Sequence, residues 1–146
     1  MNLKPAHALG LGALAVAAFT FAPFASAKNA YRLAAQEQFK LLDKNGKGEI
    51  GCIYCHASPN GGSNWNKYGQ ELRGFYFGDA KRKIGEALYL SLKADKDSDG
   101  DTYSDVLEVI AKTLPGDASS KPTQSVAALA AELKKLGGVD VFKPKP

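Results

Sequence analysis

The spacing of apolar residues predicts helices in four parts of the chain. Leucine, isoleucine, valine, alanine and aromatic residues recur there at intervals of three and four positions, as on one face of a helix. These stretches are 29–42, 80–93, 104–114 and 125–136. Asn29, Asp79 and Ser104 stand where N-caps are expected, and Gly137 follows the last stretch as a C-cap. No long alternating pattern predicts a strand. We therefore expect a small single domain, mostly α, with about four helices and long loops.

The N-terminus follows a different pattern, which is typical of an export signal. Lys4 is the only charge before Lys28, and the apolar run AHALGLGALAVAAFTF follows it. Pro23 and the small-residue triplet ASA come next. This order predicts a secretory signal peptide cleaved after Ala27, and hence a periplasmic or secreted protein. An uncleaved membrane anchor is the alternative, which the Ala/Gly-rich composition and Pro23 disfavour.

Composition divides the chain into three parts. We expect a signal peptide at 1–27 and a domain at 28–117 that holds both the cysteine motif and the acidic run. A linker, a C-terminal helix and a flexible tail are expected at 118–146. The formal charge is +4, but six of the 15 acidic residues lie between positions 95 and 108. The densest basic run, KRK at 81–83, is expected to be a solvated helix face. We expect neither nucleic-acid binding nor a membrane span after signal cleavage.

The sequence CIYCH contains the only two cysteines of the chain, Cys52 and Cys55, followed by His56. Cys-x-x-Cys-His is the attachment pattern of haem c. Each thiol adds across one haem vinyl group, and the adjacent histidine becomes the proximal iron ligand. In an oxidising compartment, a cysteine pair is either a disulfide or covalently used. The motif therefore predicts one haem c, with His56 on the iron.

The two cysteines could instead form a zinc site, a redox-active dithiol or a plain disulfide. A zinc site needs four ligands, which the mature chain does not offer. A thioredoxin-like dithiol needs a βαβ context, which the helical pattern lacks. A short Cys52–Cys55 disulfide with a coincidental His56 remains open beside the haem.

A sixth iron ligand is hard to find in the sequence. His7 and Met1 lie in the predicted signal peptide, so after cleavage His56 is the only histidine and no methionine remains. His/Met and bis-His coordination within one mature chain are therefore excluded. The iron is expected to be five-coordinate, water-ligated or bound by an unusual donor. The donors considered are Lys67, Tyr68, the α-amino group of Lys28 and a partner's side chain. The aromatic residues of 65–77 are expected either to wall a haem pocket or to form core.

The acidic run DSDGDTYSDVLE predicts a calcium loop. Oxygen ligands fall at loop positions 1, 3, 5, 7, 9 and 12, the spacing of an EF-hand. They are Asp97, Asp99, Asp101, the Tyr103 carbonyl, Asp105 (directly or through water) and Glu108. Thr102 stands at position 6, where glycine is usual. A register that starts at Asp95 places Gly100 there but puts Val106 at position 12, without a carboxylate, so we prefer the first register. A solvated acidic turn is the alternative.

The two motifs together resemble known exported proteins. NGKGEIGCIYCHASPNGGSNWNKYG is similar to the Cys-x-x-Cys-His, Gly-Gly, Asn-x-aromatic-Gly run of small exported bacterial monohaem c-type proteins. In those proteins, an acidic loop of thrombospondin type 3 or EF-hand kind follows. The arrangement also resembles temptin-like secreted proteins, which bind no haem. The likeness covers about residues 45–117 in short islands.

These features predict an exported, calcium-stabilised monohaem c-type protein that transfers electrons with an unknown redox partner protein. Sensing of a small ligand at an open iron site is a variant. The alternative is a haem-free secreted calcium-binding interaction module with a Cys52–Cys55 disulfide. With a single mature histidine, the chain offers no set of residues for hydrolysis, which disfavours an enzyme and leaves turnover of a substrate at the iron open.

Overall fold

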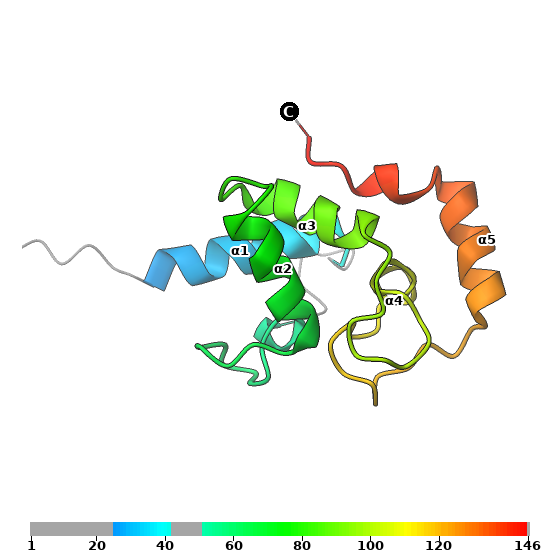
Figure 1. Cartoon of the computed structure of the whole chain (residues 1–146), viewed down its shortest axis with the longest axis horizontal. Coiled ribbons are helices and arrows are strands. Elements are labelled where there is room, and N and C mark those ends of the chain that lie inside the picture. The colour runs from blue at the N-terminus through cyan, green and yellow to red at the C-terminus, as the bar shows by residue number, and fades with distance from the viewer. Residues whose placement is uncertain (1–24, 42–50, 146) are drawn as a thin grey trace, which may run out of the picture.

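A computed structural model describes residues 25–41 and 51–145, with side chains from residue 30 onward. In these ranges there are five α-helices, two short 3₁₀-helices and no strand (Figure 1). They are α1 (Ala25–Gln38), η1 (Cys52–Tyr54), α2 (Lys67–Phe77), α3 (Ile84–Lys93), α4 (Asp105–Ala111), α5 (Val126–Leu136) and η2 (Val139–Phe142). The expectation of a small, mostly helical single domain is confirmed. Most of the predicted signal peptide lies outside the described residues.

The predicted helix 29–42 ends earlier than expected. Its counterpart α1 stops at Gln38 because Lys40 adopts a left-handed conformation with φ 57°. The backbone then turns, and the Leu41 N–H donates to the Gln36 carbonyl at 2.7 Å. This bond satisfies a carbonyl at the helix end and directs Leu41 into the core, where it is buried.

The predicted helix 80–93 begins later, at Ile84. Lys81 and Arg82 have φ values of 47° and 64°, which cannot continue a right-handed helix. Asp79 is therefore not the N-cap, and Lys83 takes that position. The residues before Ile84 instead form a tight turn that links α2 to α3.

Helix α2 was not predicted. Its residues include aromatic side chains that point into the core, into a cavity and towards solvent, so no single apolar face is visible in the sequence. Asn66 starts the helix, because its side-chain Oδ1 accepts a hydrogen bond from the Gly69 N–H at 2.7 Å.

The last two α-helices follow the sequence more closely. Ser104 precedes α4, which is shorter than predicted because Lys112 turns left-handed with φ 60°. Ser125 caps α5 by accepting from the Ala128 N–H, and Gly137 ends it with φ 103°. The prediction for α5 is confirmed at both ends.

Helix α3 lies at the centre of the core. Ala87, Leu88 and Leu92 on this helix are at most 1% exposed. Helices α1, α2 and α4 all pack against α3, and α5 packs against α4. Figure 1 shows α1, α2 and α3 gathered at one end of the molecule and α5 at the other. No helix in the described ranges is both long and apolar enough to cross a bilayer.

The end of the chain differs from the expected flexible tail. Phe142 is only 3% exposed and packs edge-on against Phe39, with ring centroids 5.9 Å apart. The Gln38 Nε2 group donates to the carbonyls of Phe142 and Gly85, at 2.7 and 2.8 Å. Tertiary packing therefore orders a segment whose composition suggests fraying, and residues 118–145 share the core of the rest of the domain.

Candidate functional site

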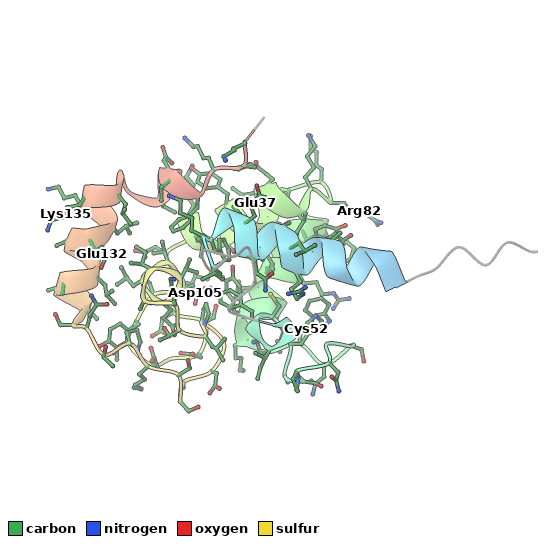
Figure 2. All side chains as sticks on the ribbon, turned by 180° about the vertical axis from the view of Figure 1, so that it is seen from behind. Glu37, Cys52, Arg82, Asp105, Glu132 and Lys135 are labelled. Atoms are coloured by element: carbon green, nitrogen blue, oxygen red, sulfur yellow. The ribbon has the colours of Figure 1, made fainter. Side chains whose placement is uncertain are left out.

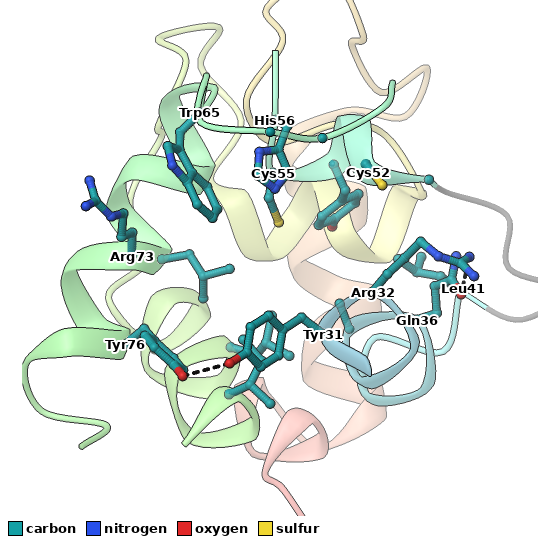
Figure 3. Close-up of a pocket in the computed structure, with 18 of the residues that line it drawn as sticks. Tyr31, Arg32, Gln36, Leu41, Cys52, Cys55, His56, Trp65, Arg73 and Tyr76 are labelled. Atoms are coloured by element: carbon teal, nitrogen blue, oxygen red, sulfur yellow. Dashed lines mark hydrogen bonds between the residues drawn. The ribbon is translucent and has the colours of Figure 1, made fainter. Parts of the chain in front are cut away.

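The Cys-x-x-Cys-His motif forms a tight turn. Within η1 and just after it, the N–H groups of Cys55 and His56 both donate to the Cys52 carbonyl, at 3.2 and 3.0 Å. This turn places the two thiols and the imidazole along one wall of a cavity (Figure 3). Cys52 and Cys55 are not joined by a disulfide bond. The structure therefore brings together all three residues that the sequence singled out for haem.

Asn66 holds this turn against α2. Its Nδ2 group donates to the carbonyls of Ile53 and Tyr54, at 3.0 Å each, while its Oδ1 caps α2. Gly69 is required by the same contact, since a Cβ there would lie 1.9 Å from the Cys55 carbonyl oxygen. The Asn-x-aromatic-Gly run thus has a structural role, which is to dock α2 directly on the cysteine motif.

The loop between His56 and Trp65 folds back on the Cys-x-x-Cys-His motif. The rings of His56 and Trp65 stack with centroids 4.1 Å apart, and the two residues form an isolated β-bridge. Gly61 has φ 73°, and a Cβ there would lie 3.7 Å from the Cys52 sulfur. Trp65 and the glycine-containing loop therefore fix the orientation of the imidazole and one face of the thiol wall.

The cavity has a volume of about 470 Å³ and is lined mainly by apolar groups from α1, α2 and α3. Its apolar side chains include Ala35, Leu41, Leu72, Ile84 and Leu88. Cavities of this size and character are typical of cofactor and small-molecule sites.

Two tyrosines lie across the cavity from His56 (Figure 3). The hydroxyls of Tyr31 on α1 and Tyr76 on α2 share a hydrogen bond of 2.9 Å. This bond, with some burial, raises the pKa of Tyr31 above its usual value. The raised pKa favours the neutral phenol of Tyr31 at the cavity.

Two sixth-ligand candidates named from the sequence, Tyr68 and Lys67, are described by the structure and do not line this cavity. Tyr68 is fully buried, and its hydroxyl shares a hydrogen bond of 3.0 Å with the Ser91 hydroxyl. Desolvation raises its pKa well above the usual value, which disfavours the phenolate. Lys67 is exposed at the start of α2. The side chain of Lys28 lies outside the described residues.

The aromatic residues of 65–77 divide between the cavity wall and the core. Trp65, Tyr76 and Phe77 line the cavity, whereas Tyr68 belongs to the core. Sequence reasoning missed Tyr31, Arg73 and Arg82 as cavity residues. No local pattern marks them, because Tyr31 reaches the cavity through the packing of α1 on α3, Arg73 through the placement of α2, and Arg82 through the turn before α3.

The environment of Cys55 argues against a redox-active dithiol. Burial, with the neighbouring Cys52 adding to it, raises the pKa of the Cys55 thiol to about 12. Reactive cysteines of disulfide oxidoreductases have lowered pKa values, because the thiolate is the nucleophile.

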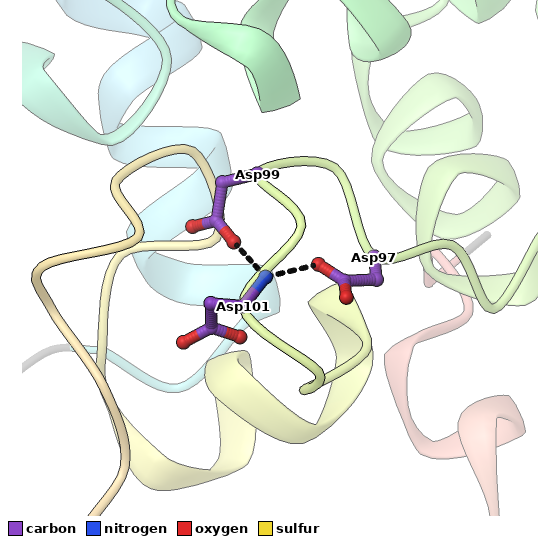
Figure 4. Close-up of side chains that lie close together, drawn as sticks. All are labelled: Asp97, Asp99 and Asp101. Atoms are coloured by element: carbon purple, nitrogen blue, oxygen red, sulfur yellow. Dashed lines mark hydrogen bonds between the residues drawn. The ribbon is translucent and has the colours of Figure 1, made fainter.

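The acidic loop gathers carboxylates at a second place in the molecule. Asp97, Asp99 and Asp101 each offer an oxygen within 4.8 Å of the others (Figure 4). Backbone N–H groups of Gly100 and Thr102 donate to Asp97, at 2.7 and 2.8 Å. The loop is therefore wrapped around its first carboxylate.

Glu108 on α4 is not one of these three clustered carboxylates, but its side chain interacts electrostatically with Asp99 and Asp101. It is fully buried, and desolvation together with the charges of Asp99 and Asp101 raises its pKa to about 9. Within the described part of the chain, three buried carboxylate oxygens have no hydrogen-bond donor. They are Asp99 Oδ2, Asp101 Oδ2 and Glu108 Oε2. Buried carboxyl oxygens without a hydrogen-bond donor are costly, and a bound cation would offset this cost.

Two other expected calcium ligands, Asp105 and Tyr103, do not belong to the cluster of three aspartates. Both oxygens of Asp105 accept hydrogen bonds from Ser98, from its N–H at 2.9 Å and its hydroxyl at 2.7 Å. The Tyr103 hydroxyl donates to the Gln124 carbonyl at 3.0 Å. Thr102 has φ 87°, so the strain expected from a β-branched residue at position 6 is present.

Figure 2 shows Cys52 and Arg82 towards one side of the molecule, and Asp105 between them and α5.

Comparisons with protein-family models, with curated proteins and with solved structures found no match to this chain. The resemblance to exported haem c proteins thus rests on short motifs alone.

Proposed function

We propose that this protein is an exported monohaem c-type protein that transfers electrons with a redox partner protein. The observation that carries the proposal is the joint opening of Cys52, Cys55 and His56 into one apolar cavity of about 470 Å³. Two thiols and an imidazole at this spacing fit the vinyl groups and the iron of one haem.

The residues present fit the roles that such a cofactor requires. Cys52 and Cys55 would hold it through thioether bonds, and His56, oriented by its stacking on Trp65, would provide the proximal nitrogen. When bound, the haem iron supplies one-electron redox chemistry. The apolar side chains of α1 and α3 exclude water, and the closure of the motif by Asn66 and Gly69 keeps the thiols and imidazole in one arrangement.

The test is covalent attachment. Protein from a host with a haem c maturation system should retain haem stain on a denaturing gel, and Cys52→Ala with Cys55→Ala should abolish it. Wild-type protein that carries no covalent haem from such a host would overturn the proposal. A Cys52–Cys55 disulfide in that protein would instead support the haem-free calcium-binding module.

A second candidate function is binding of a small ligand such as CO or NO at an open iron site. Among the described cavity-lining residues there is no lysine, methionine or second histidine opposite His56, and the Tyr31–Tyr76 pair lies there instead. An open position and two hydroxyl groups on the opposite wall suit an exogenous ligand.

The ferrous protein should then bind CO readily and show no Met–iron band in the near infrared. Tyr31→Phe and Tyr76→Phe should each shift the C–O stretching frequency, because each removes a hydroxyl from the wall opposite His56. Tyr68→Phe is the matched control, since its hydroxyl bonds Ser91 away from the cavity. Ferrous protein that does not bind CO would exclude the open site and leave electron transfer.

We also propose that the acidic loop binds one calcium ion that supports the fold. The clustering of Asp97, Asp99 and Asp101 supports it, as does the buried Glu108 carboxylate with an oxygen that no donor satisfies, because oxygen-only shells with a closing glutamate suit calcium. The same burial of Glu108 supports the register that starts at Asp97. The ion would link the loop after α3 to α4.

A further inference from the structure

We propose that Arg73 and Arg82 form an anion clamp at the cavity, which binds the carboxylate groups of an apolar, disc-shaped ligand. This inference rests on the proposed function, and in a haem c protein the carboxylates are the two haem propionates. The clamp assigns these two arginines a role that the sequence motifs do not indicate.

The two guanidinium groups come from different elements but converge on one ring. Arg73 belongs to α2, and Arg82 to the turn before α3. Their guanidinium carbons lie 5.6 and 5.3 Å from the centroid of the Phe77 ring, and both side chains line the cavity. Phe77 is 54% exposed, so this place lies where the cavity meets solvent.

The charges at this place are not balanced by the protein. In the described ranges, neither Arg73 nor Arg82 forms an ion pair with a carboxylate; the ion pairs found there join Lys96 to Glu71 and Lys143 to Asp140. Two like charges held around one ring repel each other, and an anion between them would turn this repulsion into attraction.

The backbone is strained where it positions Arg82. Lys81 and Arg82 are consecutive residues with positive φ, a conformation that is unfavourable for side chains with a Cβ. The Arg82 N–H donates to the Tyr76 carbonyl at 2.8 Å, and the Lys83 N–H to the Ala80 carbonyl at 2.9 Å. These bonds keep the turn folded back over the end of α2 and hold Arg82 beside Phe77.

The thiols and Arg73 lie on different walls of the cavity, as the two edges of a haem would require. Its vinyl groups and its propionates lie on opposite edges of the macrocycle. Figure 3 shows Arg73 on a different wall from Cys52. A planar guanidinium can bind a carboxylate through two parallel hydrogen bonds, which a lysine cannot do. The clamp would therefore orient the ligand with its carboxylates at the cavity mouth and its apolar edge towards the thiols.

The first experiment compares hemin with hemin dimethyl ester, which lacks the free carboxylates. Both are titrated into the Cys52→Ser, Cys55→Ser chain, or into the wild-type chain made without maturation where that variant fails to fold. Hemin should bind at least about tenfold more tightly than the ester, and Arg73→Gln or Arg82→Gln should remove most of this preference. Lys93→Gln is the matched control, because Lys93 lies 5.7 Å from the Tyr89 ring and does not line the cavity.

The second experiment uses resonance Raman spectra of the covalently loaded protein. The propionate bending mode should shift in Arg73→Gln and Arg82→Gln, shift less in Arg82→Lys, and not shift in Lys93→Gln. Equal binding of hemin and its ester, or arginine variants that behave as Lys93→Gln does, would overturn the clamp. If wild-type protein from a maturation-competent host carries no covalent haem but the chain still prefers hemin through these arginines, the proposed function is overturned and the clamp stands.

Discussion

At the scale of single residues, Gly69 shows how closely the cysteine motif and α2 approach each other. A Cβ at this position would lie 1.9 Å from the Cys55 carbonyl oxygen, a backbone atom that cannot move without displacing the motif. We predict that Gly69→Ala lowers the free energy of unfolding by about 1–3 kcal/mol, as overpacking does, and reduces the yield of covalent haem. Gly74→Ala on the same helix is the control.

A Cβ at Gly74 would meet nothing within 4 Å, and alanine suits a helix better than glycine. Gly74→Ala should therefore be neutral or stabilise the protein by up to about 1 kcal/mol. Urea unfolding of both variants, together with haem stain per mole of protein, checks the prediction. Equal stability of the two variants would contradict the close contact between α2 and Cys55.

At the scale of elements, the acidic loop and α4 form one unit whose stability should depend on calcium. An ion that binds only the folded loop stabilises the fold by about 2.7 kcal/mol at a free concentration a hundredfold above its dissociation constant. We predict that Glu108→Gln removes this response, because it deletes the closing charge. Without calcium at neutral pH the same variant should be about as stable as the wild type, because a carboxyl with a pKa of about 9 is mostly protonated there and glutamine is its neutral counterpart.

Asp95→Asn is the matched control for this prediction. Asp95 is exposed and has φ 50°, a conformation that asparagine tolerates well. Thermal melting of both variants, with calcium and with chelator, separates the two registers of the loop. Loss of the calcium response in Asp95→Asn with retention in Glu108→Gln would show that the loop starts at Asp95. Wild-type protein that melts at the same temperature in both conditions would show a solvated acidic turn.

At the scale of the whole molecule, the C-terminal segment completes the core that the first three helices begin. Phe142 packs on Phe39 of the turn after α1, and Leu129 of α5 is fully buried. We predict that Phe142→Ala lowers the free energy of unfolding by about 3–5 kcal/mol, as for other buried aromatic residues. Val126→Ala, at a position 43% exposed, should change it by less than about 0.5 kcal/mol.

Urea unfolding curves of these two variants test whether residues 118–145 belong to one cooperative unit with the cavity-bearing part. A single transition that moves to lower urea in Phe142→Ala is the expected result. A separate early transition, with the main one unmoved, would instead show that the C-terminal segment folds as an independent unit.

Local patterns in the sequence determined the features that depend only on neighbouring residues. The helix α5 was predicted at both ends because Ser125, the apolar period and Gly137 all act within a few positions of one another. The Cys-x-x-Cys-His turn and the carboxylate spacing of the acidic loop are local for the same reason. Short-range hydrogen bonds and the geometry of one turn are enough to place these side chains.

Only the tertiary structure decided the features that depend on which distant segments meet. Helix α2 escaped prediction because its aromatic side chains face core, cavity and solvent in turn. Tyr31 and Arg82 became cavity residues through the packing of α1 on α3 and through a strained turn, and neither is marked by a local pattern. The burial of Phe142 likewise depends on Phe39, about a hundred positions earlier. Apolar burial is non-directional, so the sequence shows which residues leave water but not which partners they find.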